Sequence, residues 1–180
     1  MLTITIPGVE FFDEELEEFV NTKDCTLELE HSLISLSKWE SKWGRPFLSP
    51  EKRTDEQALD YIRFMTITRN VDEKVYAAIP DNVMKQVSDY IEAPMTATTF
   101  YEIKSPTGRP ETVTAELIYY WMIALTIPFE CQKWHLNRLM TLIRVCNVKN
   151  QPPQKMSRSE IASRNRSLNA ARRKALGTTG

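Results

Sequence analysis

At residues 115–125 the chain reads AELIYYWMIAL, its most apolar stretch, in which Glu116 is the single charged residue. The stretch is long enough for about three turns of α-helix. A helix that is apolar almost all round is buried on several sides. We therefore expect residues 115–125 to form the central helix of the core, with Trp121 among its buried side chains.

The sequence after this stretch predicts a second core helix over residues 129–147. Pro128 can begin a helix, and apolar residues then recur at spacings of three and four. Before the stretch, residues 98–103 and 112–114 are rich in β-branched and aromatic side chains and flank the turn-forming segment SPTGRP at 105–110. This arrangement predicts a β-hairpin.

Two short strands are predicted near the N-terminus. Residues 2–6 alternate as LTITI and stop at Pro7-Gly8, and residues 25–30 alternate in the same way. We expect these two strands to pair with each other. The charge run DEELEE at 13–18 lies between them, where we favour a loop or a single helical turn with its charges in solvent.

A helix is predicted over residues 31–43. The apolar period changes there from two toward 3.6, and Gly44 follows as a helix-ending residue. Trp39 and Trp43 are four residues apart and share one side of this helix. Their spacing favours core packing over a platform on which a sugar or a base would stack.

Two more helices are predicted before residue 93. Thr54 and Gln57 have the spacing of a capping box, and an apolar stripe follows, which predicts a helix to about Thr68. Residues 81–92 repeat this pattern and stop before Ala93-Pro94. A residue that precedes proline is driven out of helical geometry, so the helix should end there.

The composition changes near the end of the chain. Residues 149–156 include two adjacent prolines and almost no large apolar side chain, which is typical of a linker. Residues 157–180 begin with the capping-box pattern SRSE and carry a narrow apolar stripe, which predicts a basic helix closed by Gly177. The predicted fold is therefore mainly α. A helical domain over 1–148, with a small N-terminal β element and a hairpin, precedes the linker and the basic helix.

Charge is balanced over the whole chain and strongly segregated along it. Among the 180 residues, 23 are Lys or Arg and 24 are Asp or Glu. Residues 1–60 carry 14 acidic and 6 basic side chains, whereas residues 133–180 carry 1 and 11. One end can therefore attract an anionic partner that the other end repels, or the two ends can attract each other.

Composition also limits the setting in which the protein works. Its 3 cysteines are too few and too far apart in sequence for a disulfide framework, which favours a reducing, cytosolic environment. The apolar stretch over 117–129 is shorter than the roughly 20 residues that a membrane span requires. The N-terminus lacks the pattern of a signal peptide. We expect neither secretion nor insertion into a membrane.

The sequence lacks the groupings that catalysis and cofactor binding require. His31 and His135 are the only histidines, and neither belongs to a catalytic or metalloprotease motif. Cys131 and His135 have a spacing that could supply two metal ligands, but no third ligand accompanies them. The 5 glycines do not cluster into a phosphate-binding loop. We expect a protein that is not an enzyme and holds no metal or cofactor.

Five cations within eleven residues of the C-terminal helix form the candidate binding site. They are Arg164, Arg166, Arg172, Arg173 and Lys174. Such a helix can bind nucleic acid in a salt-dependent manner, but it has no aromatic side chain for base stacking. We favour an acidic protein surface as its partner, on another protein or on a second copy of this chain. Nucleic acid and a merely solvated helix are the alternatives.

Several segments resemble one family of small proteins from tailed bacteriophages of Gram-positive hosts. They are residues 31–48, residues 90–99, and residues 116–147 together with the Arg- and Ala-rich residues 164–180. Proteins of this kind resemble phage tail assembly chaperones, and the resemblance extends over nearly the whole chain. It implies a mostly helical, non-enzymatic helper that coats the tape measure protein while the tail tube polymerises around it.

The function that this resemblance implies is chaperoning of tail assembly in the host cytoplasm. The basic C-terminal end departs from the family, whose members are often acidic overall. This departure leaves two alternatives, a structural component of the virion in the tail or at the head–tail connection, and a DNA-associated phage protein. The expected partners are the tape measure protein or other tail proteins, with a homo-oligomer and nucleic acid as further alternatives.

Overall fold

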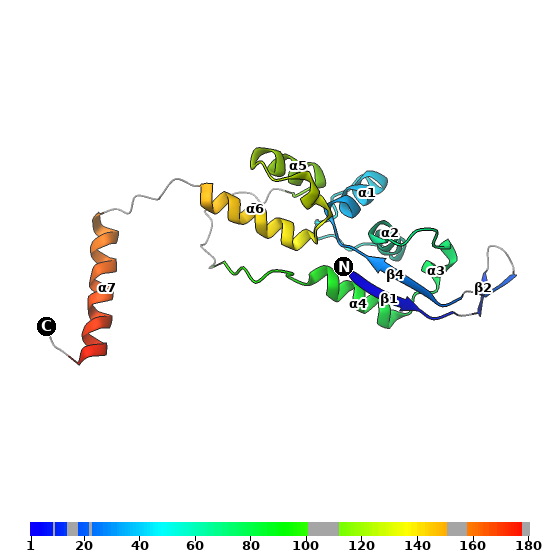
Figure 1. Ribbon diagram of the computed structural model, residues 1–180, viewed down its shortest axis with the longest axis horizontal. Coiled ribbons are helices and arrows are strands. Elements are labelled where there is room, and N and C mark those ends of the chain that lie inside the picture. The colour runs from blue at the N-terminus through cyan, green and yellow to red at the C-terminus, as the bar shows by residue number, and fades with distance from the viewer. Residues whose placement is uncertain (9, 14–17, 22, 101–111, 151–157, 178–180) are drawn as a thin grey trace. The chain divides into compact units, whose positions relative to one another are not determined.

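The chain is mainly helical with a small antiparallel β element at its N-terminus, as predicted (Figure 1). The computed structural model describes residues 1–8, 10–13, 18–21, 23–100, 112–150 and 158–177. In chain order, its elements are β1 (Leu2–Ile6), β2 (Glu10–Asp13), β3 (Glu18–Asn21), β4 (Cys25–Leu29), α1 (Leu33–Trp43), α2 (Asp55–Met65), α3 (Glu73–Ala77), α4 (Asp81–Glu92), α5 (Ala115–Ala124), the 3-10 helix η1 (Phe129–Lys133), α6 (Leu136–Asn150) and α7 (Arg158–Leu176).

Strands β1 and β4 pair antiparallel, which confirms the predicted pairing (Figure 1). Alternation places successive side chains on opposite faces of a strand. Accordingly Ile4 and Ile6 of β1, and Leu27 and Leu29 of β4, are buried. The polar residues that alternate with them, Thr3, Thr5, Thr26 and Glu28, are exposed. This hairpin therefore covers one side of the core.

The acidic segment between these strands differs from the prediction. Strands β2 and β3 pair antiparallel, with Phe11 opposite Val20 and Phe12 opposite Phe19, so strands extend into both ends of the charge run. The prediction of a loop or a helical turn was therefore wrong at these ends, and residues 14–17 lie outside the described residues. The aromatic and β-branched residues that flank the charge run favour strands.

The ends of helices α1 and α2 follow the capping residues that the sequence contains. The hydroxyl of Ser32 accepts a hydrogen bond from the Ser35 N–H at the start of α1. Gly44, with φ +59°, ends this helix in the left-handed region that favours glycine. At the start of α2 the side chains of Thr54 and Gln57 each accept from the other residue's backbone N–H, which confirms the capping box.

Helix α2 ends at Met65, three residues before the predicted end. Residue Thr66 leaves helical geometry and forms an isolated antiparallel bridge with Leu29. The Ile67 N–H then donates to the carbonyl of Glu28 at 2.8 Å. The β-branched residues 66–68 therefore lie beside strand β4 instead of extending the helix.

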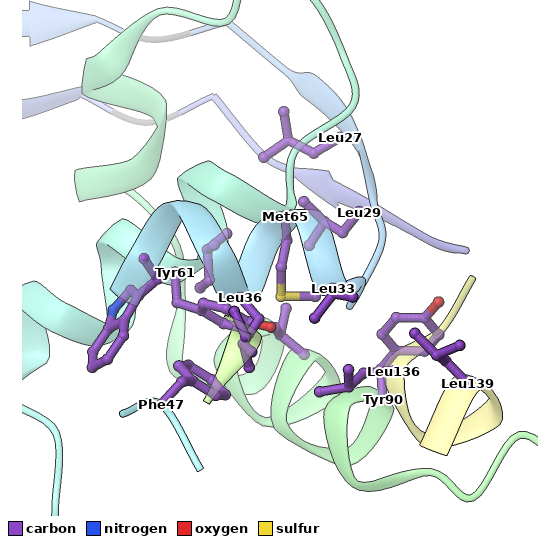
Figure 2. Packing of buried hydrophobic residues seen from close by; sticks show 14 of the residues in the cluster. Leu27, Leu29, Leu33, Leu36, Phe47, Tyr61, Met65, Tyr90, Leu136 and Leu139 are labelled. Carbon is purple, nitrogen blue, oxygen red and sulfur yellow. The ribbon is translucent and has the colours of Figure 1, made fainter. Parts of the chain in front are cut away.

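The core lies between the N-terminal hairpin, α1, α2, α4 and the start of α6 (Figure 2). Trp39 of α1 has no exposed surface, and its indole N–H donates to the Gln57 carbonyl at 2.8 Å. This confirms core packing for Trp39, while its neighbour Trp43 is half-buried. Figure 2 labels ten of the residues that fill the core: Leu27, Leu29, Leu33, Leu36, Phe47, Tyr61, Met65, Tyr90, Leu136 and Leu139.

Helix α5 forms where it was predicted, but it does not lie at the centre of the core. It packs against α1 through one face. On its other side Tyr120 and Ile123 are each 62% exposed, and Trp121 is half-buried. A sequence that is apolar all round does not reveal which face is covered, and the expected burial on several sides was wrong. The buried residues of α5 are Ala115, Ile118 and Met122.

A buried carboxylate ties α5 to α1. Oε1 of Glu40, on α1, accepts from the Phe47 N–H at 2.7 Å, and Oε2 accepts from the Ala115 N–H at 2.7 Å. Glu40 is 8% exposed. One side chain thus satisfies two backbone donors, one in the loop after α1 and one in the first turn of α5.

The second core helix, predicted over residues 129–147, is divided into two separate helices. The 3-10 helix η1 ends at Lys133, and α6 begins at Leu136. Between them His135 forms an isolated antiparallel bridge with Ser32, and the Leu136 N–H donates to the His31 carbonyl at 2.7 Å. This bridge requires extended backbone, so the helix cannot run continuously from 129 to 147.

The predicted second hairpin falls largely on residues 101–111, which lie outside the described residues. At its two ends, residues 98–100 and 112–114, the structure describes no strand.

The chain divides into two compact units, residues 1–146 and residues 147–180. Helix α6 continues to Asn150, two residues into the predicted linker, and the rest of that linker lies outside the described residues. Helix α7 forms in the segment predicted to be a basic helix and ends before Gly177, which has φ +64°.

Candidate functional site

All five predicted binding residues lie on α7 and are exposed to solvent. Arg166 donates from Nε to the Ala162 carbonyl at 3.3 Å, so its chain lies along the helix. Arg166 and Arg173 are seven residues apart, which places them on the same side of a helix. The other three cations point to other sides of the helix, so the five are distributed around α7 and do not share one face. We call these five exposed residues together the basic surface: Arg164, Arg166, Arg172, Arg173 and Lys174.

A narrow apolar stripe accompanies the basic surface. Ile161 and Leu168, seven residues apart, are 45% and 46% exposed, and Leu176 at the end of α7 is 75% exposed. The capping residue Ser157 lies outside the described residues, so the predicted capping box is not seen. A helix with so little apolar surface gains little stability by itself. The stripe and the cations together suit a partner that is both apolar and acidic.

Sequence analysis missed a second exposed apolar surface, which lies on α5 and η1. Tyr120 and Ile123 of α5 and Phe129 of η1 are more than half exposed. The ring of Phe129 lies 6.4 Å from that of Tyr119, whose hydroxyl donates to Gln132 at 3.0 Å. Exposed apolar residues that gather on one surface mark sites of contact with other molecules. The signal in the sequence is the all-apolar composition of α5, which also fits a helix buried in the core.

The two histidines, far apart in the sequence, lie together in the core. The ring centroids of His31 and His135 are 5.0 Å apart, and both side chains are buried. Nδ1 of His31 is 2.5 Å from the hydroxyl of Tyr61. Nδ1 of His135 accepts from the Asn137 N–H, so Nε2 carries the proton and donates to the Tyr90 carbonyl at 3.0 Å. The pair connects α1, α2, α4 and α6.

Both imidazoles are held in their neutral form. The pKa of His31 is lowered to about 3. Burial is the main cause, and the nearby His135 and Arg53 add to it. Burial also lowers the pKa of His135, against the opposing effect of its hydrogen bond to the Tyr90 carbonyl and of Glu30. Protonation of either ring would place a cation in the core.

We expect the protein to lose stability as the pH falls from 8 to 5. In the unfolded chain a histidine has a pKa near 6.5. Below that pH the unfolded state binds a proton that the folded state does not bind. The free energy of unfolding therefore decreases as the pH is lowered from about 6.5 to about 3. For His31 alone the loss at pH 5 should be about 2 kcal/mol. Urea unfolding at pH 8, 6.5 and 5 measures it, and an unchanged free energy of unfolding at pH 5 would contradict the burial of a neutral pair.

No group of three or more His, Cys, Asp or Glu side chains is placed to hold a metal ion in the part of the chain that the structure describes. Both ring nitrogens of His135 are engaged in hydrogen bonds, so it cannot join Cys131 as a ligand without breaking them. None of the described helices has the length and apolar character needed to cross a membrane.

Comparisons of the chain with models of protein families, with curated proteins and with solved structures give no match. The candidate surfaces therefore rest on the geometry of this chain alone.

Proposed function

We propose that this chain is a phage tail assembly chaperone that binds the tape measure protein in the host cytoplasm and catalyses no reaction. The proposal joins the resemblance of the sequence to tail assembly chaperones with the surfaces described above. Its partner is the one that the resemblance implies, and its mode of binding is inferred from the exposed residues.

The observation that carries the proposal is the exposure of α7. Its cations and apolar stripe are all open to solvent, so the helix presents both charge and apolar contacts to a partner. Ordering against a partner would stabilise a helix that is marginal alone. Positive charge accelerates encounter with an acidic partner and disfavours a basic one. The basic surface thus supplies attraction, and the stripe supplies the contact area.

The apolar surface on α5 and η1 supports the same function. A chaperone must hold apolar segments of another protein until they are assembled, and exposed aromatic and aliphatic side chains provide such contacts. Tyr120, Ile123 and Phe129 supply them without disturbing the buried face of α5.

Mass spectrometry of purified virions, together with recovery of the protein from infected cells, separates a chaperone from a structural component. We expect the protein to co-purify with the tape measure protein from cells and to be missing from finished virions. Its stoichiometric presence in virions would contradict the chaperone and favour a component of the tail or of the head–tail connection.

A gel shift with duplex DNA tests the third alternative. The cations of α7 are the observation that favours it, because an exposed basic helix can contact phosphates. We expect no retention of DNA at low salt. Retention that weakens steeply as salt is raised would favour a DNA-associated protein instead.

A further inference from the structure

A half-open apolar pocket lies between α2, α4 and the loop that follows α1. Its volume is about 150 Å³. The pocket belongs to the unit formed by residues 1–146 and shares no residue with the basic surface. Its buried wall consists of Phe47, Tyr61, Ile62 and Val87, and its outer part includes Arg53, Ala58, Met84, Ser88 and Ile91.

Arg53 is the single charged residue that lines this pocket. Its guanidinium carbon lies 3.8 Å from the centre of the Phe47 ring, which in turn stacks on Tyr61 with centroids 3.9 Å apart. One guanidinium nitrogen donates to the Phe47 carbonyl at 2.5 Å. These contacts fix the plane of the guanidinium at the pocket and leave other N–H donors of its fork for a ligand.

The charge of Arg53 has no ion-pair partner among the described residues, whereas the nearby Arg45 pairs with Glu51 at 2.7 Å. Partial burial lowers the pKa of the Arg53 guanidinium, Tyr61 opposes this shift, and the positive charge of Arg45 lowers the pKa further. Arg53 is nevertheless exposed to solvent as a whole residue, so a ligand that enters the pocket can reach its guanidinium. A carboxylate bound there would form two parallel hydrogen bonds with the fork.

We propose that this pocket binds the C-terminal residue of a peptide, with an apolar side chain in the pocket and the α-carboxylate on Arg53. A cavity of about 150 Å³ holds a group the size of benzene, which matches one leucine or phenylalanine side chain. A C-terminal residue carries its side chain and its carboxylate on the same carbon, so both groups can be held within one small site. The open side of the pocket lets the rest of the peptide leave into solvent.

This binding site goes beyond the proposed chaperone function. It recognises the C-terminal carboxylate of a peptide, and no residue of α7 lines it. The two can therefore fail separately. If the basic surface does not bind a tape measure protein, the pocket can still bind a peptide. If the pocket binds no peptide, the proposed role of the basic surface is unaffected.

The test is an NMR titration of the full-length, ¹⁵N-labelled protein with two matched peptides. Acetyl-Gly-Gly-Phe with a free carboxylate should shift the amides of residues around the pocket, such as Val87 and Ser88, in a saturable way. Its C-terminal amide should bind at least about tenfold more weakly, since it lacks the charge-assisted hydrogen bonds. Equal binding of the two peptides would overturn the role of the carboxylate. Tighter binding of 3-phenylpropionate than of the acid peptide would overturn the peptide and assign the pocket to a small free acid.

Variants of the rim test which residue selects the carboxylate. Arg53→Gln should lower the affinity for the acid peptide by at least about tenfold and leave the weak affinity for the amide peptide unchanged. Lys52→Gln removes an exposed charge from the neighbouring position outside the pocket lining and should change neither. If Arg53→Gln does not fold, Arg53→Lys is the second variant. It keeps the positive charge but removes the two-pronged guanidinium, so it should still lower the affinity for the acid peptide. Wild-type affinity in a folded Arg53 variant would overturn the proposal.

Discussion

Replacing Glu40 by Ala should lower the free energy of unfolding by about 2–6 kcal/mol. The substitution removes the side chain that accepts from two backbone donors, the Phe47 and Ala115 N–H groups, both bonded at 2.7 Å. A buried donor left without a partner costs about 1–3 kcal/mol. A domain of ordinary stability has about 5–15 kcal/mol in total, so this variant should be close to unfolding at elevated temperature. Urea unfolding followed by circular dichroism measures the loss.

Glu40→Gln is the matched control for this prediction. Its side chain has the same length and keeps one oxygen that can accept from one of the two donors. It should therefore lose less stability than Glu40→Ala. Equal stability of Glu40→Ala and the wild type would mean that the two N–H groups find other partners and that this side chain does not join α1 to α5.

Replacing Trp39 by Ala should remove about 3–5 kcal/mol, the range for deleting a large buried aromatic side chain. Trp39 has no exposed surface, and its ring meets that of Phe47 edge to face with centroids 5.1 Å apart. The variant also leaves the Gln57 carbonyl without its indole donor. The expected result is a large fall in the urea midpoint without a change in the slope of the transition.

Trp121→Ala provides the comparison for Trp39→Ala, because the two residues are chemically identical and differ in burial. Trp121 is half-buried on α5, so its truncation should cost clearly less. The sequence predicts burial of Trp121 as well as core packing of Trp39, and so does not distinguish the two. A larger loss at Trp121 than at Trp39 would show that α5 is covered on its outer side, for example by another copy of the chain.

Local signals in the sequence predicted helix positions well because capping is a local interaction. Gly44 and the Thr54–Gln57 box act within four residues of where they stand, so their spacing is sufficient. The start predicted at residue 31 is two residues early, because the cap at Ser32 was not considered. The pairing of β1 with β4 was predictable as well, since both strands alternate and no strand other than these has a similar pattern among the described residues. These features required no knowledge of distant contacts.

The errors arose where distant contacts decide the structure. Residues 66–68 leave the helix because β4 offers them backbone partners, and β4 precedes them by more than thirty residues. His135 interrupts the helix predicted over 129–147 because it pairs with Ser32. On α5, the identity of the covered face depends on α1 and is not encoded in an all-apolar sequence.

The candidate surfaces were predictable to different degrees. The residues of the basic surface all belong to one helix, α7. A predicted helix and the charged residues within it were therefore sufficient to list them. The pocket at Arg53 combines residues from α2, α4 and a loop, and no spacing in the sequence relates them. The pairing of His31 with His135, over a hundred residues apart, is hidden for the same reason.

The central claim is that the chain acts by binding a protein through the basic surface of α7. Reversal of Arg172, Arg173 and Lys174 to Glu changes the charge of that surface by six units while all three side chains are exposed. The melting transition of the rest of the chain should therefore stay at its wild-type temperature. Reversal of Lys38, Lys52 and Lys85, which are exposed outside α7, gives a control variant with the same change in net charge.

The most direct measurement is a pull-down of a tape measure protein fragment by these three full-length proteins at the same salt concentration. The account predicts that the wild type and the control variant retain the fragment and that Arg172→Glu/Arg173→Glu/Lys174→Glu does not. Retention of the fragment by the α7 variant at the wild-type level would contradict it.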